Sequence, residues 1–324
     1  MAPQTLAHSP LAPGDNESLA TATFIHDPTK SWAIYGELHE GGEAQYYRFN
    51  VTVGDRIHIM LFKPTSPEEG DFMPGFVLMG PGVGKQGIVP DYVEVPAGAD
   101  TLVVMGEQPD QATYEPFSPS SFFSLADLEL EAPNSDTYYA AVYEPSMGGH
   151  YGLAIGDRES YTLSEWILIP LNLLSVYQWE GQSLAFIIAP LIATLVIGIG
   201  LLIWLQLQNK TALRTLFGWL GSLAGLLFVG TGAMTLTQMV FSLTQAPLTS
   251  EIVITLLFAS IPIVLGLVTL RLSLKTVKEA KLRMRIYLAV LGVVALFMWA
   301  GFLIGPALAI VASVLPSRLV VGKS

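Results

Sequence analysis

Residues 112–123, ATYEPFSPSSFF, gather the side chains of this chain that are best suited to binding a ligand. One carboxylate, Glu115, stands among prolines, serines and four rings, which belong to Tyr114, Phe117, Phe122 and Phe123. Exposed aromatic faces beside a carboxylate can bind a sugar or a partner protein. The segment is therefore our candidate ligand or partner loop. The alternative is that the rings plug one end of a β-sandwich, with Ser118 and Ser120 satisfying turn amides.

Other chemistries find little support in the sequence. The chain has no cysteine, which excludes disulfides, thiolate metal sites and cysteine nucleophiles. The stretch GPGVGKQG at 80–87 lacks the hydroxyl residue that a phosphate-binding loop needs after Lys85. Copper at Met147 and His150, or calcium at the acidic 67–71, remains open as an alternative. We predict no catalytic residue, no cofactor and no metal site, although an enzyme site assembled only in space stays possible.

Charge divides the chain into two halves. Of its 27 acidic residues, 24 lie in 1–165, whereas 10 of its 16 basic residues lie in 166–324. Only 13% of all residues are charged and 51% are hydrophobic, a balance typical of membrane proteins. We therefore expect an acidic, water-facing half and an apolar half with basic edges. An acidic surface argues against nucleic acid as a partner.

The apolar half predicts four transmembrane helices, at about 184–207, 214–243, 252–271 and 286–314, followed by a short tail at 316–324. Their interiors carry no ionisable side chain, which argues against ion or proton translocation.

Basic residues predict the orientation of these spans. The first connection carries Lys210 and Arg214, and the third carries Lys275, Lys278, Lys281, Arg283 and Arg285. Cytoplasmic loops collect Lys and Arg, so residues 1–183 and the tail should lie outside the cell. Arg318 and Lys323 in the tail point weakly the other way. The basic residues of the third connection are also candidates for contact with anionic lipid.

An outer domain of this length has to be translocated, yet residues 1–20 contain no apolar signal region. We expect that a signal peptide was removed or that it precedes this start. Residues 1–30 are predicted to be a flexible segment, because they are rich in Pro, Ala and Ser.

From 31 to 158 the pattern predicts an all-β sandwich. Short alternating runs are separated by Gly, Pro and Asp, and the predicted strands are 45–51, 55–62, 75–80, 101–106, 137–144 and 150–156. In one of them Ile57, Ile59 and Leu61 share a face, as expected where one side of a strand is buried.

Residues 159–181 predict an amphipathic helix at the membrane surface. Thr162 and Glu165 fit a capping box, and Pro170 should kink the helix. Its anchors in the interface would be Trp166, Tyr177 and Trp179. The alternative is a helix packed beneath the sandwich.

Four segments within about 31–181 resemble a group of uncharacterised prokaryotic membrane-anchored ectodomain proteins. They are SWAIYGELHEGGEAQYYRFNVTVGDRI, FMPGFVLMGPG, TYEPFSPSSFF and YYAAVYEPSMGGHYGLAIGDRESY. The last departs from the group's closing pattern at Gly149 and His150. The chain is also similar, more loosely, to the secreted pre-peptidase C-terminal β-sandwich. The resemblance implies a membrane-anchored sandwich and assigns no activity or catalytic residue.

We therefore expect a non-enzymatic cell-envelope protein that serves as a binding, scaffolding or accessory subunit of a membrane complex, with protein partners or a homo-oligomer. The alternative is a module that senses a carbohydrate or small molecule. A cleft lined by Tyr114, Glu115 and Phe117 would favour this module, whereas fully buried rings would favour the scaffold. The second alternative is an envelope enzyme.

Overall fold

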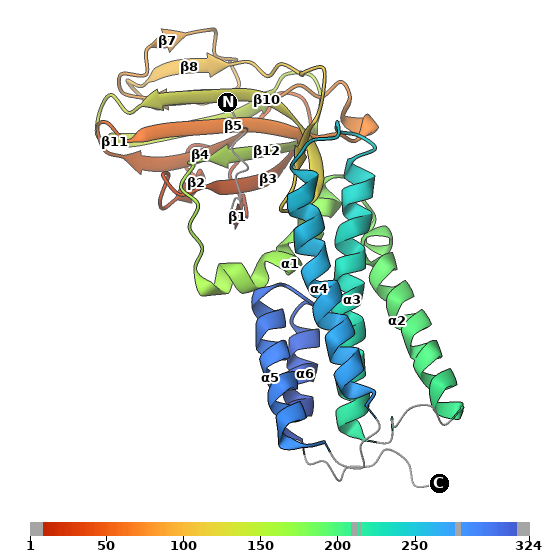
Figure 1. Cartoon of the computed structure of the whole chain (residues 1–324). Helices are drawn as coiled ribbons and strands as arrows, with labels where there is room; N and C mark the ends of the chain where they lie inside the picture. Colours follow the sequence, from red (N-terminus) through yellow and green to blue (C-terminus); the bar gives the residue numbers. More distant parts are fainter. Residues whose placement is uncertain (1–8, 209–212, 214, 276–279, 316–324) are drawn as a thin grey trace.

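The structure, a computed structural model, describes residues 9–208, 213, 215–275 and 280–315. A β-rich domain stands at one end of a group of long helices (Figure 1). The C-terminal ends of α2 (Leu184–Leu207) and α4 (Ile252–Ser273) lie at the end of the helix group that is farther from this domain.

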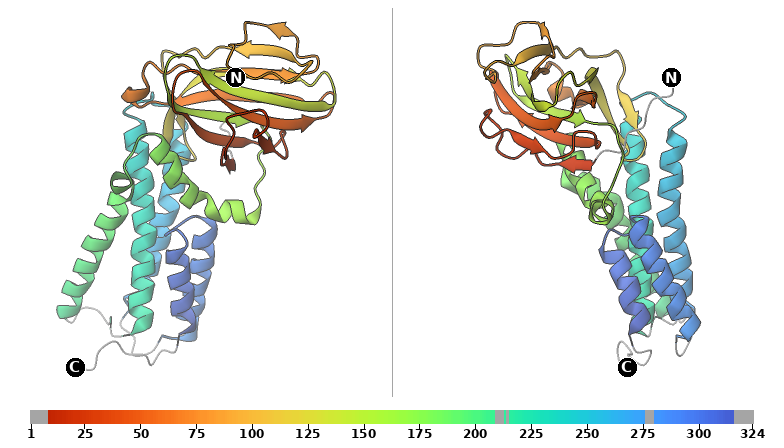
Figure 2. Two further views of the ribbon diagram at one scale, coloured as in Figure 1. Left: turned by 180° about the vertical axis from the view of Figure 1, so that it is seen from behind. Right: turned by 90° about the vertical axis from the view of Figure 1, so that its left-hand side faces the viewer.

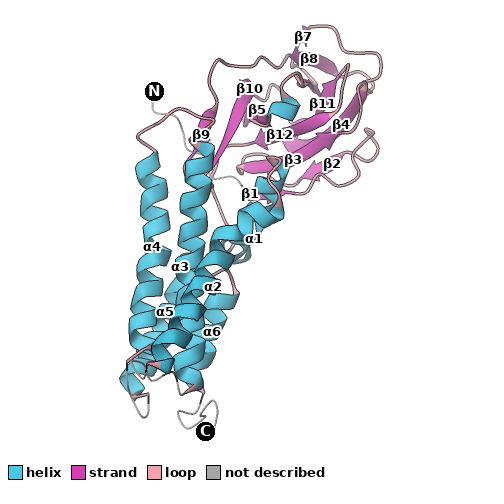
Figure 3. Cartoon of the chain, turned by 90° about the vertical axis from the view of Figure 1, so that its right-hand side faces the viewer, coloured by secondary structure: helices cyan, strands magenta, loops and turns pink. Residues whose placement is uncertain are grey.

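The β-rich domain is built from two six-stranded sheets. The first has the order β1-β3-β12-β5-β10-β9 and the second the order β2-β4-β11-β6-β8-β7 (Figure 3). The strands of the first sheet are β1 Ser9–Leu11, β3 Trp32–Leu38, β12 Gly149–Ile155, β5 Arg56–Pro64, β10 Ser120–Glu131 and β9 Thr113–Glu115. Those of the second are β2 Thr23–Ile25, β4 Glu43–Val51, β11 Asp136–Glu144, β6 Gly75–Gly80, β8 Asp100–Val104 and β7 Lys85–Gln86. One short 3₁₀ helix, η1, spans Pro67–Glu69.

The core lies between the two sheets. Ile57, Ile59 and Leu61 of β5 are buried there, as the alternation predicted, and they pack in one cluster with Phe76 and Leu78 of β6 in the other sheet. The two-layer β architecture is thus confirmed.

The prediction of a flexible segment at 1–30 is wrong for residues 9–30. Two short strands form there, β1 beside β3 and β2 beside β4, both in parallel register. Ser9 and Asn16 are each only 1% exposed. This segment is ordered because its strands pair with β3 and β4 and several of its side chains are buried, neither of which can be predicted from its composition. Residues 1–8 lie outside the described part.

Three helices are long and apolar enough to cross a membrane, which confirms the first three predicted spans: α2, α3 (Leu216–Ser242) and α4. Close packing between α3 and α4 depends on small residues. A Cβ on Gly225 would lie 2.9 Å from the carbonyl oxygen of Gly266, so only glycine allows this approach.

The predicted fourth span, 286–314, is wrong as a single crossing. Two shorter helices replace it, α5 (Leu282–Phe297) and α6 (Ile304–Val314), joined by a turn at 298–303 that we call the hairpin tip. They run side by side and in opposite directions (Figure 2). At 1.5 Å per residue the 16-residue α5 is about 24 Å long, short of the ~30 Å hydrocarbon core.

Arg285 shows which end the chain returns to. Its Nε and an Nη donate to the carbonyl oxygens of Ser313 and Leu315, each at 2.6 Å. The end of α6 therefore lies beside the beginning of α5, at the basic end of the helices and not at the sandwich end as predicted. The tail 316–324 itself lies outside the described residues.

The helix predicted over 159–181 is α1 (Leu163–Trp179), and its capping box is confirmed. Glu165 N donates to Thr162 Oγ1 at 3.2 Å, and Thr162 N donates back to Glu165 Oε2 at 2.7 Å. The ribbon of α1 changes direction between its two halves, as expected around Pro170 (Figure 2).

Candidate functional site

The 112–123 segment forms a hairpin, β9–β10, whose turn rests on the ends of α3 and α4. Tyr114 Oη donates to Thr255 Oγ1 at 2.7 Å, and Thr255 in turn donates to Pro116 O at 2.7 Å. Ser242 Oγ donates to Pro119 O at 3.1 Å. These bonds tie the sandwich to the helices, so the segment is the joint between the two parts.

The four rings of the segment do not plug an end of the sandwich, and that alternative is wrong. Tyr114 and Phe123 pack with Ala246 and Ile252 near the start of α4. Phe117 meets Phe258 of α4 edge-on, with ring centroids 5.5 Å apart. Phe122 packs on Phe62, its neighbour within the sandwich sheet. The rings therefore divide between the helices and the sandwich.

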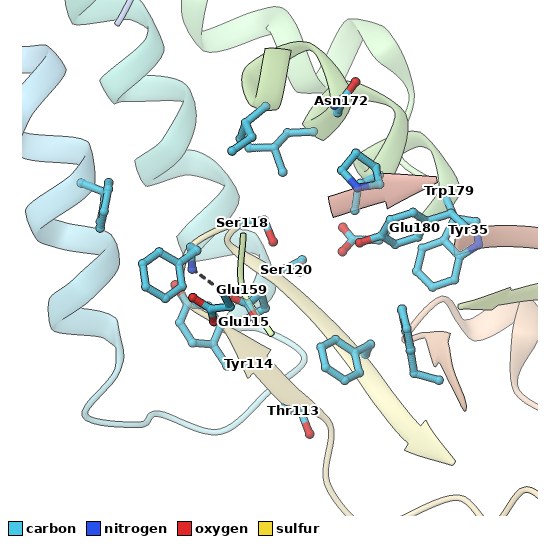
Figure 4. A pocket seen from close by; sticks show the side chains of 18 of the residues that line it. Tyr35, Thr113, Tyr114, Glu115, Ser118, Ser120, Glu159, Asn172, Trp179 and Glu180 are labelled. Atoms are coloured by element: carbon cyan, nitrogen blue, oxygen red, sulfur yellow. Dashed lines mark hydrogen bonds between the residues drawn. The ribbon is translucent and has the colours of Figure 1, made fainter. Parts of the chain in front are cut away.

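A cavity of about 400 Å³ opens between these surfaces, and we call it the joint cavity. Its walls come from the β9–β10 hairpin, the sandwich face of β3 and β5, helix α1, the start of α4 and the hairpin tip. Figure 4 shows the hairpin side with Glu115 and the sandwich side with Tyr35. Residues as far apart in the sequence as Pro10 and Trp299 thus line one cavity. Of these lining segments, the sequence analysis proposed only residues 112–123 as a candidate ligand site.

The side of the cavity nearest the membrane helices is aromatic and held by hydrogen bonds. The ring centroids of Trp166 in α1 and Trp299 in the hairpin tip lie 4.5 Å apart. The ring of Trp299 also stacks on that of Phe258, with centroids 5.9 Å apart. Trp299 Nε1 donates to Trp166 O at 2.8 Å, and Trp166 Nε1 donates to Phe297 O at 3.0 Å. Both indoles are therefore fixed in orientation.

The hairpin tip carries unusual backbone conformations. Trp299 has φ 55° and Phe302 has φ 53°, values that bulky residues rarely adopt. Gly301 between them has φ 74°, and its amide donates to Thr231 Oγ1 at 3.0 Å. Such strain persists only where the surroundings enforce it, and it often marks a functional site.

The opposite side of the cavity is formed by Tyr35, Phe62 and Trp179. The ring centroid of Trp179 lies 5.1 Å from that of Tyr35 and 5.7 Å from that of Phe62. Trp179 Nε1 donates a hydrogen bond to Gly36 O at 3.2 Å. Tyr177 is 2% exposed. Tyr177 and Trp179 therefore contact protein, and the predicted role as membrane-interface anchors is wrong for both. The C-terminal end of α1 instead packs beneath the sandwich.

Glu115 faces the cavity from the turn of the hairpin (Figure 4). Its Oε1 accepts a hydrogen bond from Phe117 N at 2.9 Å. Burial raises the pKa of the Glu115 carboxyl to about 7, and the nearby carboxylates of Glu251 and Glu159 add to the rise. Glu115 can therefore gain or lose a proton near neutral pH.

Glu180 is a second such group, and the sequence reasoning missed it. It follows α1 directly and faces the cavity beside Trp179 and Tyr35 (Figure 4). Gln182 Nε2 donates to Glu180 Oε2 at 3.0 Å. Burial raises its pKa to about 8, against the lowering effect of this hydrogen bond. Its signal in the sequence was a single carboxylate within a long apolar stretch.

Glu159 and Glu251 also line the cavity, so four carboxylates share it. Among the described lining residues there is no Lys, Arg or His. Across the described chain, no three His, Cys, Asp or Glu residues are grouped closely enough to hold a metal ion. The cavity therefore combines carboxyl groups with aromatic surface.

A smaller cavity of about 60 Å³ lies among the helices next to the joint cavity. The two share Phe117, Leu173, Phe258 and Trp299 as lining residues. Most of the other residues around the smaller space are apolar, including Met234, Pro262 and Phe302. The four shared residues therefore stand between the two cavities.

The copper and calcium candidates have other partners. His150 Nδ1 lies 2.6 Å from Glu69 Oε1, and His150 N donates to Glu69 Oε2 at 3.1 Å. Met147 packs against the sandwich core. Both His150 and Glu69 are thereby tied into the sandwich.

The predicted lipid-facing basic residues lie far from the cavity, at the other end of the helices. Lys275, Lys281 and Arg283 are exposed there, while Arg285 binds the end of α6. Lys210, Arg214 and Lys278 lie outside the described residues. Contact of this end with anionic lipid stays a prediction.

Comparison with protein-family models found no match, and a search among curated proteins also found none. The assignment of a site therefore depends on the geometry of the joint cavity alone.

Proposed function

We propose that this chain is a membrane-anchored binding protein of the cell envelope, whose joint cavity takes up a small organic ligand. The observation that carries the proposal is a cavity of about 400 Å³ lined by Tyr114, Glu115 and Phe117. Ligand sites commonly measure 300–1,000 Å³ and combine apolar walls with a few polar groups. This is the arrangement that favours the small-molecule binding module over a passive scaffold.

The walls suggest how binding would be passed on. Tyr35 and Phe62 belong to the sandwich, whereas Phe258 and Trp299 belong to the membrane helices. A ligand between them would contact both parts at once. Its affinity would differ between any two arrangements of the sandwich on the helices, which is the requirement for a ligand to shift such an equilibrium.

The proposed orientation has the sandwich outside the cell. Arg271, Lys275, Lys281 and Arg283 belong to the end of the helices opposite the sandwich, and the positive-inside tendency favours that end as cytoplasmic. The return of α6 to the same end makes the position of Arg318 and Lys323 in the sequence consistent with this orientation. Labelling of single introduced cysteines from outside the cell would test it.

Binding can be tested on the full chain in lipid nanodiscs. Trp166, Trp179 and Trp299 line the cavity, so bound ligand should alter tryptophan fluorescence and raise the melting temperature in a compound screen. Ser118→Phe, which fills the cavity, should abolish both responses. Ser175→Phe places the same ring at an exposed position of α1 outside the lining and should preserve them. Responses that survive in Ser118→Phe would contradict the proposal.

An envelope enzyme is the second candidate, because Glu115 and Glu180 supply two protonatable carboxyls in one cavity. A pair of this kind can serve as general acid and general base. Glu115→Gln and Glu180→Gln would then abolish turnover of a bound compound without abolishing its binding. Recovery of every bound compound unchanged would argue for binding alone.

The accessory-subunit role remains a prediction. Helix α2 exposes most of its apolar side chains, because only Ile187 and Leu202 among its residues are buried. Either lipid or a helix of a partner protein would cover this exposed surface. Purification in mild detergent followed by mass spectrometry tests the role. Partners that persist through salt washing at fixed stoichiometry would support it, and a chain purified alone would oppose it.

A further inference from the structure

We propose that the ligand of the joint cavity is an organic cation, an amine or quaternary ammonium whose charged nitrogen binds between Glu115 and Glu180 and whose apolar body packs on the aromatic walls. The inference rests on the proposed binding function and adds the chemical class of the ligand.

The charge of the cavity is the first argument. Glu115, Glu159, Glu180 and Glu251 line it, and no described lining residue carries a positive charge. A buried carboxylate without a counter-charge is costly, and proteins normally pair it. Glu115 accepts a hydrogen bond from Phe117 N and Glu180 accepts one from Gln182 Nε2, and both of these donors are neutral. A cationic ligand would supply a counter-charge for these two carboxylates, whereas an anion would be repelled.

The position of the carboxylates is the second argument. Glu180 lies near Tyr35 and Trp179, and Glu115 lies across the cavity with Glu159 near it (Figure 4). Carboxylates that converged on one point would favour a metal ion, but the described residues hold no cluster of three potential ligands. Separated carboxylates with rings between them suit a larger, diffuse cation.

The aromatic lining is the third argument. Trp166, Trp299 and Phe258 form one fixed side of the cavity, and Tyr35 and Trp179 form the other. The faces of such rings attract ammonium groups, most strongly where water is excluded. A ring would also accept the apolar part of the same molecule.

A matched set of probes tests the inference on the full chain in nanodiscs. Benzyltrimethylammonium and 2-phenylethylamine carry the positive charge, 2-phenylethanol keeps the skeleton without charge, and 3-phenylpropanoate reverses the charge. Titration calorimetry and tryptophan fluorescence would report binding. We expect the cations to bind about tenfold or more tighter than the alcohol. The carboxylate should bind weakest.

Variants locate the charge recognition. Glu115→Gln and Glu180→Gln keep the shape of the side chain, and each should weaken cation binding by about tenfold while leaving the affinity for the alcohol unchanged. Unchanged alcohol binding would show that the cavity is still formed. Glu107→Gln alters an exposed glutamate outside the cavity and should change neither affinity.

The outcomes separate this inference from the proposed function. Suppose that the alcohol binds as tightly as the cations and that Ser118→Phe blocks its binding. This result would overturn the proposal that the ligand is a cation, and it would leave the proposed binding function standing. Cation binding that persists in the Glu115→Gln/Glu180→Gln double variant would overturn the inference as well. A compound screen without any response that Ser118→Phe removes would overturn the binding function itself.

Discussion

The sandwich core and the joint cavity both bury polar groups, but they satisfy them differently. In the core, Tyr47 Oη and Tyr151 Oη lie 2.5 Å apart, and Tyr151 donates to Gln45 Oε1 at 2.6 Å. Lys63 Nζ donates to three backbone carbonyl oxygens, those of Glu69, Gly70 and Phe72. Each of these groups has its partners within the protein.

At the joint, Glu115 and Glu180 accept hydrogen bonds from Phe117 N and Gln182 Nε2, but they face the cavity without a counter-charge among the described lining residues, and their pKa values are raised to about 7 and about 8. A satisfied network rigidifies a core, whereas a charge left without a counter-charge costs stability unless a ligand provides one. The core polar groups thus serve the fold, and the exposure of the joint carboxyls to the cavity is what their proposed role in binding requires.

Lys63→Met should have the largest effect. It leaves three carbonyl oxygens without their donor, and we expect the free energy of unfolding to fall by about 3–5 kcal/mol. Thermal melting of the full chain measures the loss. Lys85→Met, at an exposed lysine of β7, should stay within about 0.5 kcal/mol. A Lys63→Met variant as stable as the parent would remove the contrast between core and joint.

The joint carboxyls should make stability depend on pH. Because the folded pKa values of Glu115 and Glu180 lie above the ordinary value of 4.5, the folded state holds more protons between about pH 5 and 8. Their contribution to stability is therefore present at low pH and is lost as pH rises through 7 and 8.

Glu180→Gln should remove its part of this loss and stabilise the chain at pH 8.5 by about 2 kcal/mol, with little change at pH 5. The titratable groups around Glu115 are Glu159, Glu251, Tyr114 and Tyr161. The groups around Glu180 are Tyr35, Tyr177, Ser120 and Gln182. Melting curves from pH 5 to 8.5 provide the measurement, with Glu107→Gln as the control. Parallel pH profiles for Glu180→Gln and the parent would show that Glu180 is ionised in the fold.

Thr255→Val should loosen the joint specifically. It removes the bonds to Tyr114 and Pro116, at an expected cost of about 1–2 kcal/mol. Hydrogen exchange should rise in the β9–β10 turn while the sandwich core stays protected. Ser260→Val, which changes an exposed side chain bonded only within α4, is the matched control. Faster exchange throughout the sandwich would mean that the joint also supports the core.

Ser118→Phe should have the smallest effect on stability, within about 1 kcal/mol, because the cavity offers space for the ring. The same variant should abolish ligand binding. Melting temperature and fluorescence titration on one sample would compare the two effects. A loss of stability as large as that of Lys63→Met would show that the site is packed and not open.

Much of the architecture was accessible from the sequence, because it follows from local periodicity. Alternation in 55–62 predicted the buried Ile57, Ile59 and Leu61 of β5, and Thr162 with Glu165 predicted the start of α1. Uninterrupted apolar stretches predicted α2, α3 and α4. In each case the signal lies within a few turns of helix or one strand.

The return of α6 was not accessible in this way. An apolar stretch such as 286–314 has the same composition whether it crosses the membrane or turns back. The turn depends on Gly301, on the bond to Thr231 and on Arg285 at the end of α6. Likewise β1 and β2 form only because β3 and β4 offer edges for them.

The apolar spans, the β-sandwich and the 112–123 segment could be predicted from the sequence, because the signal for each lies in neighbouring residues. Only the tertiary structure brought Glu115 together with Glu180, 65 positions further on, and with Trp299 at the hairpin tip. It also set their chemistry, because a carboxyl acquires a raised pKa from burial among distant side chains. Local periodicity determines strongly patterned elements such as β5, α1 and α2, whereas a cavity exists only where elements from distant parts of the chain fail to fill the space between them.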